Sequence, residues 1–417
     1  MNLDDELARW IDAHHPEQVD FLRELVRVPS DTPPGDNAAA AEKAAALLTS
    51  LDFSVERHPV PESFLRGYGM QSVTNLIIRH RFGDGGPTIA LNAHGDVVPP
   101  GEGWTKPPYE GVVENGRMKT AECMGGASPY RNRISRATAM PWRRCVRRQR
   151  EGERLYGAVE LHFTYDEEFG GLAGPGFLLT QELTRPDYAI AASFSYAVVT
   201  AHNGCLQLEL TVHGKSGHGA MPETGRDAFR AGNAILNAIY AEADALKAQK
   251  SGVPGIDHPT MIVGLMRGGI NTNVVPDRLT LKIDRRMTPE EDPVPVEAGL
   301  RSLIDRAIAG YDGIRVDVRR LLLARALKPL PGHEKLVAAI QRHGRRIFGE
   351  DIPASGTPLY ADARLYGEHG IPVVMYGAGP KTIEESNAKR PDENLALDDL
   401  RRATLVIACA VGDMLRR

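Results

Sequence analysis

Apolar positions in the first hundred residues repeat with two different periods. Residues 3–27 carry apolar side chains at helical spacing, which predicts a helix pair or a broken helix before the turn SDTPPGD. A second helix is predicted over 38–51 and a short strand over 53–56. The segments 74–79 and 88–93 are almost continuously apolar, as buried strands are. Helices alternating with such strands predict an α/β fold, in which helices flank a central mixed sheet.

Residues 204–322 follow another order, which begins with an alternating strand at 205–213 and the turn GKSGHGAMPETG. A helix, two strands, a second helix and a last strand come next, at 227–249, 260–265, 278–284, 296–309 and 314–318. This succession is that of a ferredoxin-like α+β domain, an antiparallel sheet with helices on one face. We therefore expect an inserted domain, 204–322, that interrupts an α/β domain made of 1–203 and 323–417.

The composition is that of a soluble globular protein. Of 417 residues, 42% are hydrophobic and 25% are charged, and the net charge of -4 gives no reason to expect nucleic acid or an anionic membrane as a partner. Four cysteines without a CxxC spacing indicate neither a zinc knuckle nor a disulfide framework. The acidic, amphipathic start is not typical of a signal peptide, so we expect a cytoplasmic protein.

The segment 119–154 differs from the rest of the chain. It holds ten basic and three acidic residues, shows no hydrophobic period and contains the run MPWRRCVRRQR. Three interpretations stay open: a basic patch for nucleic acid, a solvated disordered insert, or a shift of reading frame. We favour the third. Reading 123–136 one nucleotide back, with CGN for arginine and TCN for serine, permits the string YGRGVA(V/L/I)SKSDFA. A glycine-rich turn before an amphipathic helix suits an α/β domain, whereas we expect the printed residues to fold poorly.

Candidate chemistry appears first in LNAHGDVVPP, where a predicted strand ends. His94 and Asp96 lie together at that end. The carboxyl ends of strands in open α/β sheets are where ligands bind. A histidine with a carboxylate two residues on can hold a metal while the carboxylate orients the ring. In the alternative interpretation, Asp96 only caps the amides of a turn.

A second group follows the predicted strand 156–165. Asp166, Glu167 and Glu168 are consecutive carboxylates, which repel one another unless a cation or a proton relieves the charge. The strand before them is predicted to be buried, and this favours a functional site over a solvated surface turn. His162 lies inside the strand, where we expect a hydrogen-bonded core histidine rather than a ligand.

The motifs AHGDVVP, YDEEFGG, GKSGHGAMPETG, GGINTNVVPD and PDENLALDDL occur in this order, and together they resemble the M20 metallopeptidase family. This family includes acetylornithine deacetylase, succinyl-diaminopimelate desuccinylase and aminoacylase. The resemblance covers nearly the whole chain except 119–154. It implies a catalytic α/β domain interrupted by a ferredoxin-like lid that often mediates dimerisation, so a homodimer is expected.

The resemblance also implies roles for individual residues. His94 matches the family's first zinc ligand, and Asp96 matches the carboxylate that orients it. Glu167 matches the general base that activates metal-bound water, and Glu168 matches the neighbouring metal ligand. The expected cofactor is Zn2+, as one or two ions, with Co2+ or Mn2+ as substitutes.

Three residues of the lid match positions associated with the substrate. His218 matches a histidine that helps to polarise the substrate carbonyl, often from the partner subunit. Asn273 and Arg286 match substrate-binding positions, where an arginine fork suits a carboxylate. Each has a structural alternative: His218 caps its turn, Asn273 holds its loop, or Arg286 pairs with Asp284.

The chain departs from the family at three of its five metal-ligand positions. The bridging aspartate belongs in a GRGxxDxK turn, which the printed sequence lacks, and restoring the frame permits only Leu, Ile or Val there. Ser193 stands where relatives place a carboxylate. Lys389 stands where relatives place a histidine, and an ammonium group has no lone pair to donate. Lys389 is therefore a candidate cation that replaces the charge of a metal.

Two functions follow from these observations. The first is hydrolysis of the amide bond of small N-acyl amino acids or short peptides, through metal-activated water with Glu167 as general base. The second is a catalytically impaired or metal-free relative that binds a small ligand bearing a carboxylate. Metal content separates the two hypotheses.

Overall fold

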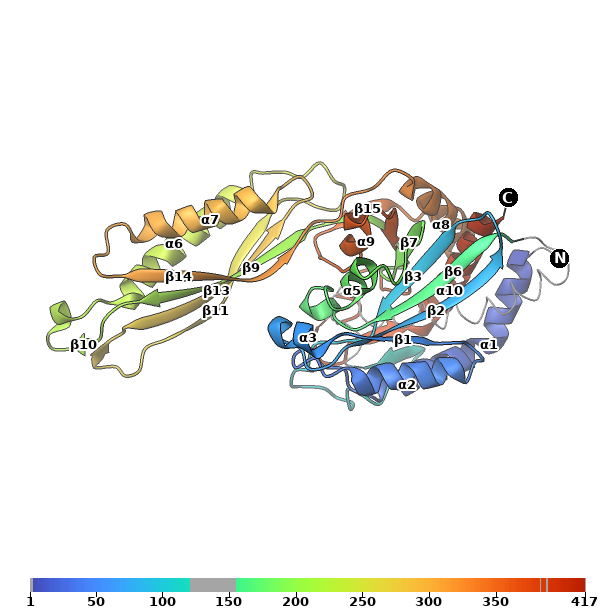
Figure 1. Cartoon of the computed structure of the whole chain (residues 1–417), viewed down its shortest axis with the longest axis horizontal. Coiled ribbons are helices and arrows are strands. Elements are labelled where there is room, and N and C mark those ends of the chain that lie inside the picture. Colours follow the sequence, from blue (N-terminus) through green and yellow to red (C-terminus); the bar gives the residue numbers. More distant parts are fainter. Residues whose placement is uncertain (1–2, 121–154, 383, 388, 417) are drawn as a thin grey trace. The chain divides into compact units, whose positions relative to one another are not determined.

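The computed structural model describes residues 3–120, 155–382, 384–387 and 389–416 (Figure 1). The chain forms two compact units. Unit 1 consists of Met1–Thr200, Lys328–Ser355 and Ala361–Arg417, and unit 2 consists of Ala201–Leu327 and Gly356–Tyr360. The anomalous segment lies outside the described residues from position 121 onward, so its three interpretations stay predictions.

Unit 1 is built on an eight-stranded sheet in the order β1-β2-β6-β3-β7-β16-β8-β15. Its strands are β1 (Glu56–Pro59), β2 (Thr74–Gly83), β3 (Thr88–His94), β6 (Gly157–Thr164), β7 (Tyr188–Ala191), β8 (Val198–His202), β15 (Ala354–Thr357) and β16 (Val373–Met375). The last two residues of β8 and of β15 belong to unit 2. Strand β3 pairs in parallel with β6 and β7, and β7 pairs in parallel with β16. Strand β2 pairs antiparallel with β1 and β6, so the sheet is mixed.

Helices cover both faces of this sheet. Leu161 and Phe163 on β6 belong to a core shared with α1 (Leu3–Val26), α8 (His333–Phe348) and α10 (Leu397–Leu415). His162, between them, faces the other side and contacts Tyr366 of α9 (Arg364–Glu368). Burial from both sides explains why β6 is buried along its whole length. The predicted α/β class, with a central mixed sheet flanked by helices, is confirmed.

The remaining elements of unit 1 are short. They are α2 (Ala38–Thr49), α3 (Glu62–Tyr68), α5 (Pro175–Thr180), the 3-10 turn η2 (Glu167–Phe169), and a three-stranded sheet of β4 (Val112–Glu114), β5 (Arg117–Lys119) and β17 (Asn394–Ala396). No helix among the described residues is long and apolar enough to cross a membrane.

Two predicted elements of unit 1 were wrong. The broken helix expected at the start is one helix, α1, although Pro16 lies inside it. An internal proline costs about 3 kcal/mol, but Ile11 and Phe21 are buried on either side of it, and this packing keeps the helix whole. The strand expected at 53–56 begins only at Glu56, because the turn after α2 continues to Asp52, whose φ is 60°.

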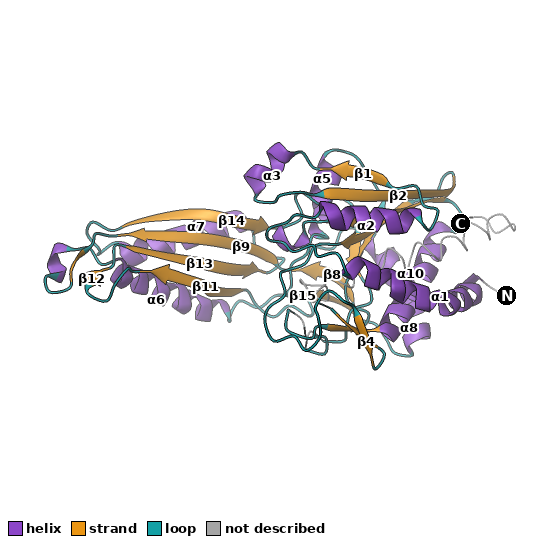
Figure 2. Cartoon of the chain, turned by 90° about the horizontal axis from the view of Figure 1, so that it is seen from below, coloured by secondary structure: helices purple, strands orange, loops and turns teal. Residues whose placement is uncertain are grey.

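Unit 2 holds a four-stranded antiparallel sheet in the order β11-β13-β9-β14. Its strands are β9 (Gly204–His213), β11 (Thr260–Gly268), β13 (Arg278–Met287) and β14 (Arg315–Ala324), and its helices are α6 (Ala228–Leu246) and α7 (Pro293–Ile308). Both helices lie on one face of the sheet (Figure 2). The chain order of these elements is the predicted ferredoxin-like one.

Candidate active site

The two motifs of the sequence meet because β3 and β6 are parallel neighbours. His94, the last residue of β3, is opposite Thr164, the last residue of β6. The backbone N–H of Gly95 then donates to the carbonyl of Thr164 at 2.8 Å. The segments that carry Asp96 and Glu167 therefore leave the sheet at the same edge, at the carboxyl ends of the strands.

Asp96 joins these two segments. Its Oδ1 lies 3.1 Å from His94 Nδ1 and accepts a hydrogen bond from the backbone N–H of Glu167 at 3.1 Å. Its Oδ2 accepts one from the N–H of Glu168 at 3.0 Å. The carboxylate is fully buried, so these hydrogen bonds replace its hydration. Asp96 thus makes the contacts of both interpretations given above, since it faces the His94 ring and also caps amides of a turn.

His94 is fully buried, and its two ring nitrogens face different groups. Nδ1 lies 3.0 Å from the backbone carbonyl of Asp96 and 3.1 Å from its carboxylate, both of which are acceptors, so Nδ1 carries the proton. Nε2 lies 3.7 Å from Glu167 Oε2. This separation is longer than a hydrogen bond.

Glu167 and Glu168 lie in the turn η2, directly after β6. Glu167 is 3% exposed, and the side chain of Glu168 is 5% exposed. Burial raises the pKa of Glu168, and the nearby charges of Lys389 and His94 oppose this effect. The Lys389 ammonium lies 3.4 Å from Glu168 Oε2, on a side chain that is half exposed.

Asp166 has a structural role that differs from the roles of Glu167 and Glu168. Its Oδ2 accepts a hydrogen bond from the N–H of Ala173 at 2.6 Å, and its carbonyl accepts from the N–H groups of Gly170 and Gly171. Burial, together with the charge of Asp96, raises the pKa of Asp166 well above its ordinary value. Asp166 therefore closes the loop that carries Glu167 and Glu168.

The loop that carries Lys389 is held by Glu393, to which the sequence analysis gave no role. The N–H of Lys389 donates to Glu393 Oε2 at 3.2 Å, and the buried Glu393 accepts a hydrogen bond at its own carbonyl from Thr120. Asn387, Lys389 and Asp392 have φ values of 54°, 54° and 56°. Residues other than glycine rarely adopt this conformation, and such residues concentrate at functional sites.

The predicted substrate-binding residues lie in unit 2. His218 ends the strand β10 (Gly217–His218), which pairs with β12 (Val274–Val275), so it lies close to Asn273. Nδ1 of His218 accepts a hydrogen bond from the N–H of Ala220, which is the turn cap named above as its alternative. The carbonyl of Asn273 accepts a hydrogen bond from Gly219 at 2.8 Å.

Arg286 lies near the other end of β13. Its guanidinium pairs with Asp284, with Nε 2.6 Å from Oδ1 and Nη2 3.2 Å from Oδ2, and it lies over the ring of Tyr360 at 5.1 Å. About 25 Å of strand separates Arg286 from the start of β13, beside which Asn273 lies. One copy of unit 2 therefore does not bring Arg286 together with His218. Tyr360 is not predictable from the sequence beyond its place in the turn GTPLYADARL.

The described residues do not fit the two-metal centre that the resemblance implies. Of its five ligand positions, His94 and Glu168 offer donors, whereas Lys389 is a cation and Ser193 offers only a neutral hydroxyl. Ser193 Oγ and Glu168 Oε1 are buried without a hydrogen-bond partner in the described part of the chain. A hydroxyl cannot supply the anionic donor that the resemblance implies at this position.

Elsewhere in the described ranges, one group of three potential ligand side chains has its ligand atoms within 4.8 Å of one another, formed by Asp4, His343 and Cys409. Arg346 already places a guanidinium there, with Nη2 at 2.9 Å from Asp4 Oδ2 and 3.6 Å from Cys409 Sγ. This cluster, on α1, α8 and α10, is therefore a neutralised structural contact rather than an alternative metal centre.

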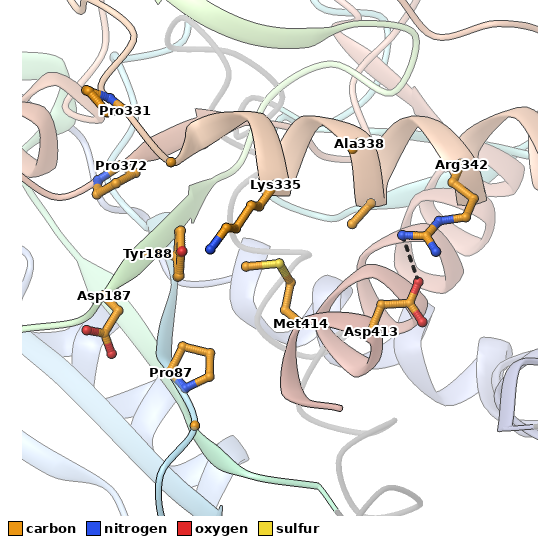
Figure 3. A pocket seen from close by; sticks show the side chains of 13 residues that line it. Pro87, Asp187, Tyr188, Pro331, Lys335, Ala338, Arg342, Pro372, Asp413 and Met414 are labelled. Carbon is orange, nitrogen blue, oxygen red and sulfur yellow. Dashed lines mark ion pairs between the residues drawn. The ribbon is translucent and has the colours of Figure 1, made fainter. Parts of the chain in front are cut away.

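A pocket of about 810 Å³ lies at the opposite edge of the sheet (Figure 3). Pro87, Tyr188 and Pro372, which line it, stand at the amino ends of β3, β7 and β16. Lys335 of α8 and Met414 of α10 point into it. Since His94 and Glu167 follow the carboxyl ends of their strands, this pocket is separate from the candidate active site.

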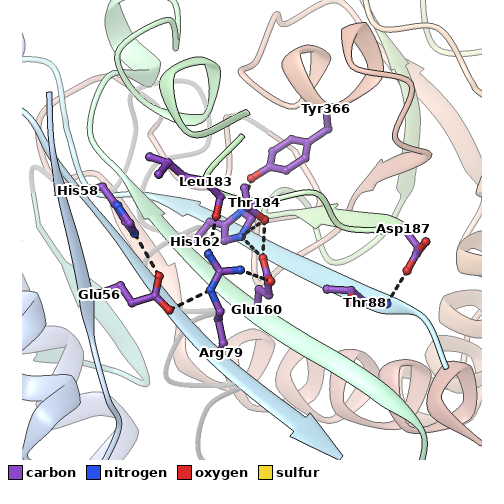
Figure 4. A network of polar contacts seen from close by, with 10 residues as sticks. All are labelled: Glu56, His58, Arg79, Thr88, Glu160, His162, Leu183, Thr184, Asp187 and Tyr366. Carbon is purple, nitrogen blue, oxygen red and sulfur yellow. Dashed lines mark hydrogen bonds and ion pairs between the residues drawn. The ribbon is translucent and has the colours of Figure 1, made fainter. Parts of the chain in front are cut away.

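A buried polar network accounts for His162 (Figure 4). Its Nδ1 lies 2.7 Å from the Tyr366 hydroxyl, and its Nε2 lies 3.0 Å from Glu160 Oε2. Glu160 also pairs with Arg79 of β2 and accepts a hydrogen bond from Thr184. Both ring nitrogens are thus engaged, and the prediction of a hydrogen-bonded core histidine is confirmed.

Comparisons with known proteins agree with this architecture. Residues 200–312 match the family model of the peptidase dimerisation domain. The chain is 29% identical over 409 residues to the succinyl-diaminopimelate desuccinylase of Methylobacterium sp. (strain 4-46), with 94% of each chain covered. It is 26% identical over 380 residues to the acetylornithine deacetylase of Myxococcus xanthus, with 90% of this chain and 92% of the relative covered.

A solved structure shows the same fold. It is that of the YXEP protein of Bacillus subtilis, a dinuclear metal-binding peptidase of the M20 family. The TM-score is 0.63 at 18% identity, and the match covers 97% of this chain and 99% of the other.

Proposed function

Because the chain belongs to the M20 metallopeptidase family, whose members named above are hydrolases, we propose that it hydrolyses the amide bond of small N-acyl amino acids or short peptides. The observation that carries the proposal is the buried carboxylate of Asp96, which links His94 to the backbone of Glu167 and Glu168. It fixes a histidine and a carboxylate side by side at the edge of the sheet where ligands bind.

Glu167 is the general base in this proposal. Its carboxylate takes a proton from water as the water oxygen bonds to the amide carbon, and it returns a proton to the amine nitrogen as the C–N bond breaks. The products are a carboxylic acid and a free amine, so no further reactant is needed. Asp96 acts as a positioning residue, because it holds the His94 ring and the turn that carries Glu167.

The expected cofactor, Zn2+ with Co2+ or Mn2+ as substitutes, has no step in this mechanism. Among the described residues, only His94 and Glu168 offer donors at the ligand positions of the family. Structural and catalytic zinc sites use three or four protein ligands. The dinuclear metal binding of relatives such as the YXEP protein is therefore not transferred to this chain.

The substrate-binding residues of the proposal are His218, Asn273 and Arg286. Asp284 binds Nε and Nη2 of Arg286, and Tyr360 lies against the guanidinium, so a substrate carboxylate would bind through Nη1 or displace Asp284. Since His218 lies far along the same sheet, we propose that it acts from the partner subunit of a homodimer. The dimerisation-domain match supports this arrangement.

The surface of unit 2 offers a site for the partner. Strand β11 is an edge of the sheet, and its Ile262 and Met266 are 57% and 63% exposed. A second β11 can extend the sheet across a two-fold axis and pack beside these side chains. Analytical ultracentrifugation should give twice the chain mass, and Ile262→Lys with Met266→Lys should give the chain mass. We place this dimer in the cytoplasm, where the described thiols Cys205 and Cys409 stay free.

The main test is release of free amine from a panel of N-acetyl amino acids, N-succinyl amino acids and dipeptides. Glu167→Gln should lower kcat by about 10²–10⁴, the usual contribution of a general base. Glu62→Gln, at a glutamate that is exposed on α3, is the matched control and should leave kcat unchanged. The proposal is wrong if no substrate of the panel releases amine, or if Glu167→Gln and Glu62→Gln have equal kcat values.

A second candidate function is favoured by Lys389 and Ser193, which replace two ligands of the family. It is a catalytically impaired relative that binds a small ligand bearing a carboxylate and does not cleave it. In that case N-acyl amino acids should raise the melting temperature of the chain, and no amine should be released.

A further inference from the structure

The described centre concentrates negative charge in a buried place. Asp96 is fully buried, Glu167 is 3% exposed, and the side chain of Glu168 is 5% exposed. Three buried carboxylates this close together need a cation or a proton to relieve their charge. The YXEP protein of Bacillus subtilis, which has the same fold, is a dinuclear metal-binding peptidase.

In this chain, Lys389 brings positive charge to one of these carboxylates, that of Glu168. Its ammonium lies 3.4 Å from Glu168 Oε2, at the hydrogen-bond limit. Its backbone is fixed as well, because its N–H donates to the buried Glu393 at 3.2 Å. The loop therefore fixes the backbone from which the ammonium reaches Glu168, and half of the side chain stays open to an incoming substrate.

The same residue works against a metal ion. An ammonium group has no lone pair to donate, and its charge repels a cation that approaches Glu168. Ser193, at the other changed position, is buried and offers a neutral hydroxyl whose oxygen has no hydrogen-bond partner in the described residues. The two substitutions remove an imidazole and a carboxylate and leave no replacement donor of comparable strength.

We infer that this centre works without a metal ion, and that the Lys389 ammonium is the fixed positive charge beside Glu168. The catalytic part of this inference rests on the proposed function. As water attacks, the Lys389 ammonium donates a hydrogen bond to the carbonyl oxygen, which gains negative charge, and it keeps its proton. The proton of the water still passes to Glu167 and then to the leaving amine.

Metal content tests the inference independently of activity. The full chain, purified without a metal-chelating tag and dialysed after incubation with Zn2+, Co2+ or Mn2+, should retain less than about 0.1 ion per chain. Any amine release should be unchanged by EDTA or 1,10-phenanthroline. About one retained ion or more per chain, with activity abolished by the chelators, would overturn the inference and leave the proposed function intact.

Variants test the part played by Lys389. Lys389→Gln should lower kcat about 10²–10³-fold, as loss of a group that stabilises an oxyanion does. It should also lower the melting temperature, since it leaves Glu168 buried without its cation. Lys381→Gln, at an exposed lysine of the same loop region, is the matched control. If Lys389→Gln behaves like the control in both measurements, Lys389 is not the charge that we assign.

The double variant Ser193→Glu with Lys389→His restores both donor types of the family. Together with His94 and Glu168 it offers four donors, so it should retain close to one Zn2+ per chain. Failure of the double variant to gain metal would contradict the assignment of metal exclusion to these two residues. If no substrate is cleaved but the natural chain is metal-free and the double variant binds Zn2+, the proposed function fails and this inference stands.

Discussion

Replacing Asp96 by asparagine tests how the candidate site is held together. The Asp96 carboxylate faces three donors: the His94 ring and the N–H groups of Glu167 and Glu168. Asparagine keeps one acceptor oxygen and places an NH2 group where the other oxygen was, so one of these donors faces another donor. A hydrogen bond to a charged group contributes about 1.5–3 kcal/mol, and a buried donor without a partner costs about 1–3 kcal/mol. We expect Asp96→Asn to lower the free energy of unfolding by about 2–4 kcal/mol.

Urea unfolding followed by far-UV circular dichroism measures this loss. The matched control is Asp187→Asn, at an exposed carboxylate that accepts one hydrogen bond, from the N–H of Thr88 at 2.7 Å. An asparagine can accept that bond as well, so the control should change stability by less than about 1 kcal/mol. Asp96→Asn should also lower kcat/KM about 10–100-fold, because it frees the His94 ring and the turn. A loss no larger than that of the control would refute the idea that this carboxylate joins the two motifs.

Three further changes probe other parts of the molecule. Burial would raise the pKa of Glu160, but His162, Thr184 and Arg79 lower it to about 2, below the unfolded value of 4.5. Its ionisation therefore adds stability above the unfolded pKa, and this is lost as the pH falls towards 2. Between pH 6 and 3 the free energy of unfolding of the natural chain should fall by about 2 kcal/mol more than that of Glu160→Gln. Equal decreases for the two proteins would contradict this. Gly171→Ala should lower the free energy of unfolding by about 1–3 kcal/mol, because φ at Gly171 is +82° and a Cβ would lie 2.7 Å from Leu365 Cδ1. Gly116→Ala, with φ of +72° and open space, isolates the backbone effect, and equal melting temperatures would argue against the clash. Tyr360→Leu should raise KM several-fold and leave kcat unchanged, since the Tyr360 ring contacts the Arg286 guanidinium. An unchanged KM in steady-state kinetics would show that Tyr360 does not position Arg286.

Much of unit 1 was predictable because buried strands mark the sequence directly. Strand β3 appears as an apolar run that stops at His94, and β6 as a β-rich run that stops before Asp166. The rule that ligands bind at carboxyl ends of strands then suggested that the two motifs form one site, although the adjacency of β3 and β6 is not written in either strand. His162 was predictable for a similar reason, since a histidine inside a buried strand needs hydrogen-bond partners.

Other features depend on contacts between segments far apart in the chain, and no local pattern indicates these. Tyr360 lies under Arg286, and Glu393 holds the loop of Lys389, only because the fold brings them there. The continuity of α1 across Pro16 is another case, since local propensity predicts a break and tertiary packing outweighs it. Asp166 resembles its two neighbours in sequence, and its hydrogen bonds from the N–H groups of Ala173, Gly170 and Gly171 separate its role from theirs.

The place of β6 between β2 and β3 has a consequence for how the protein is made. Strands β2 and β3 follow each other in the chain, yet β6 inserts between them and pairs with both. A parallel partner that arrives more than sixty residues later requires a long loop to close, and such contacts form slowly. Until β6 is synthesised, β2 and β3 each have an unpaired edge, with which a strand of another chain can pair. The protein is therefore most prone to aggregation while it emerges from the ribosome. Because the site at His94 forms only when β6 pairs with β3, ligand binding there indicates that the central sheet is complete.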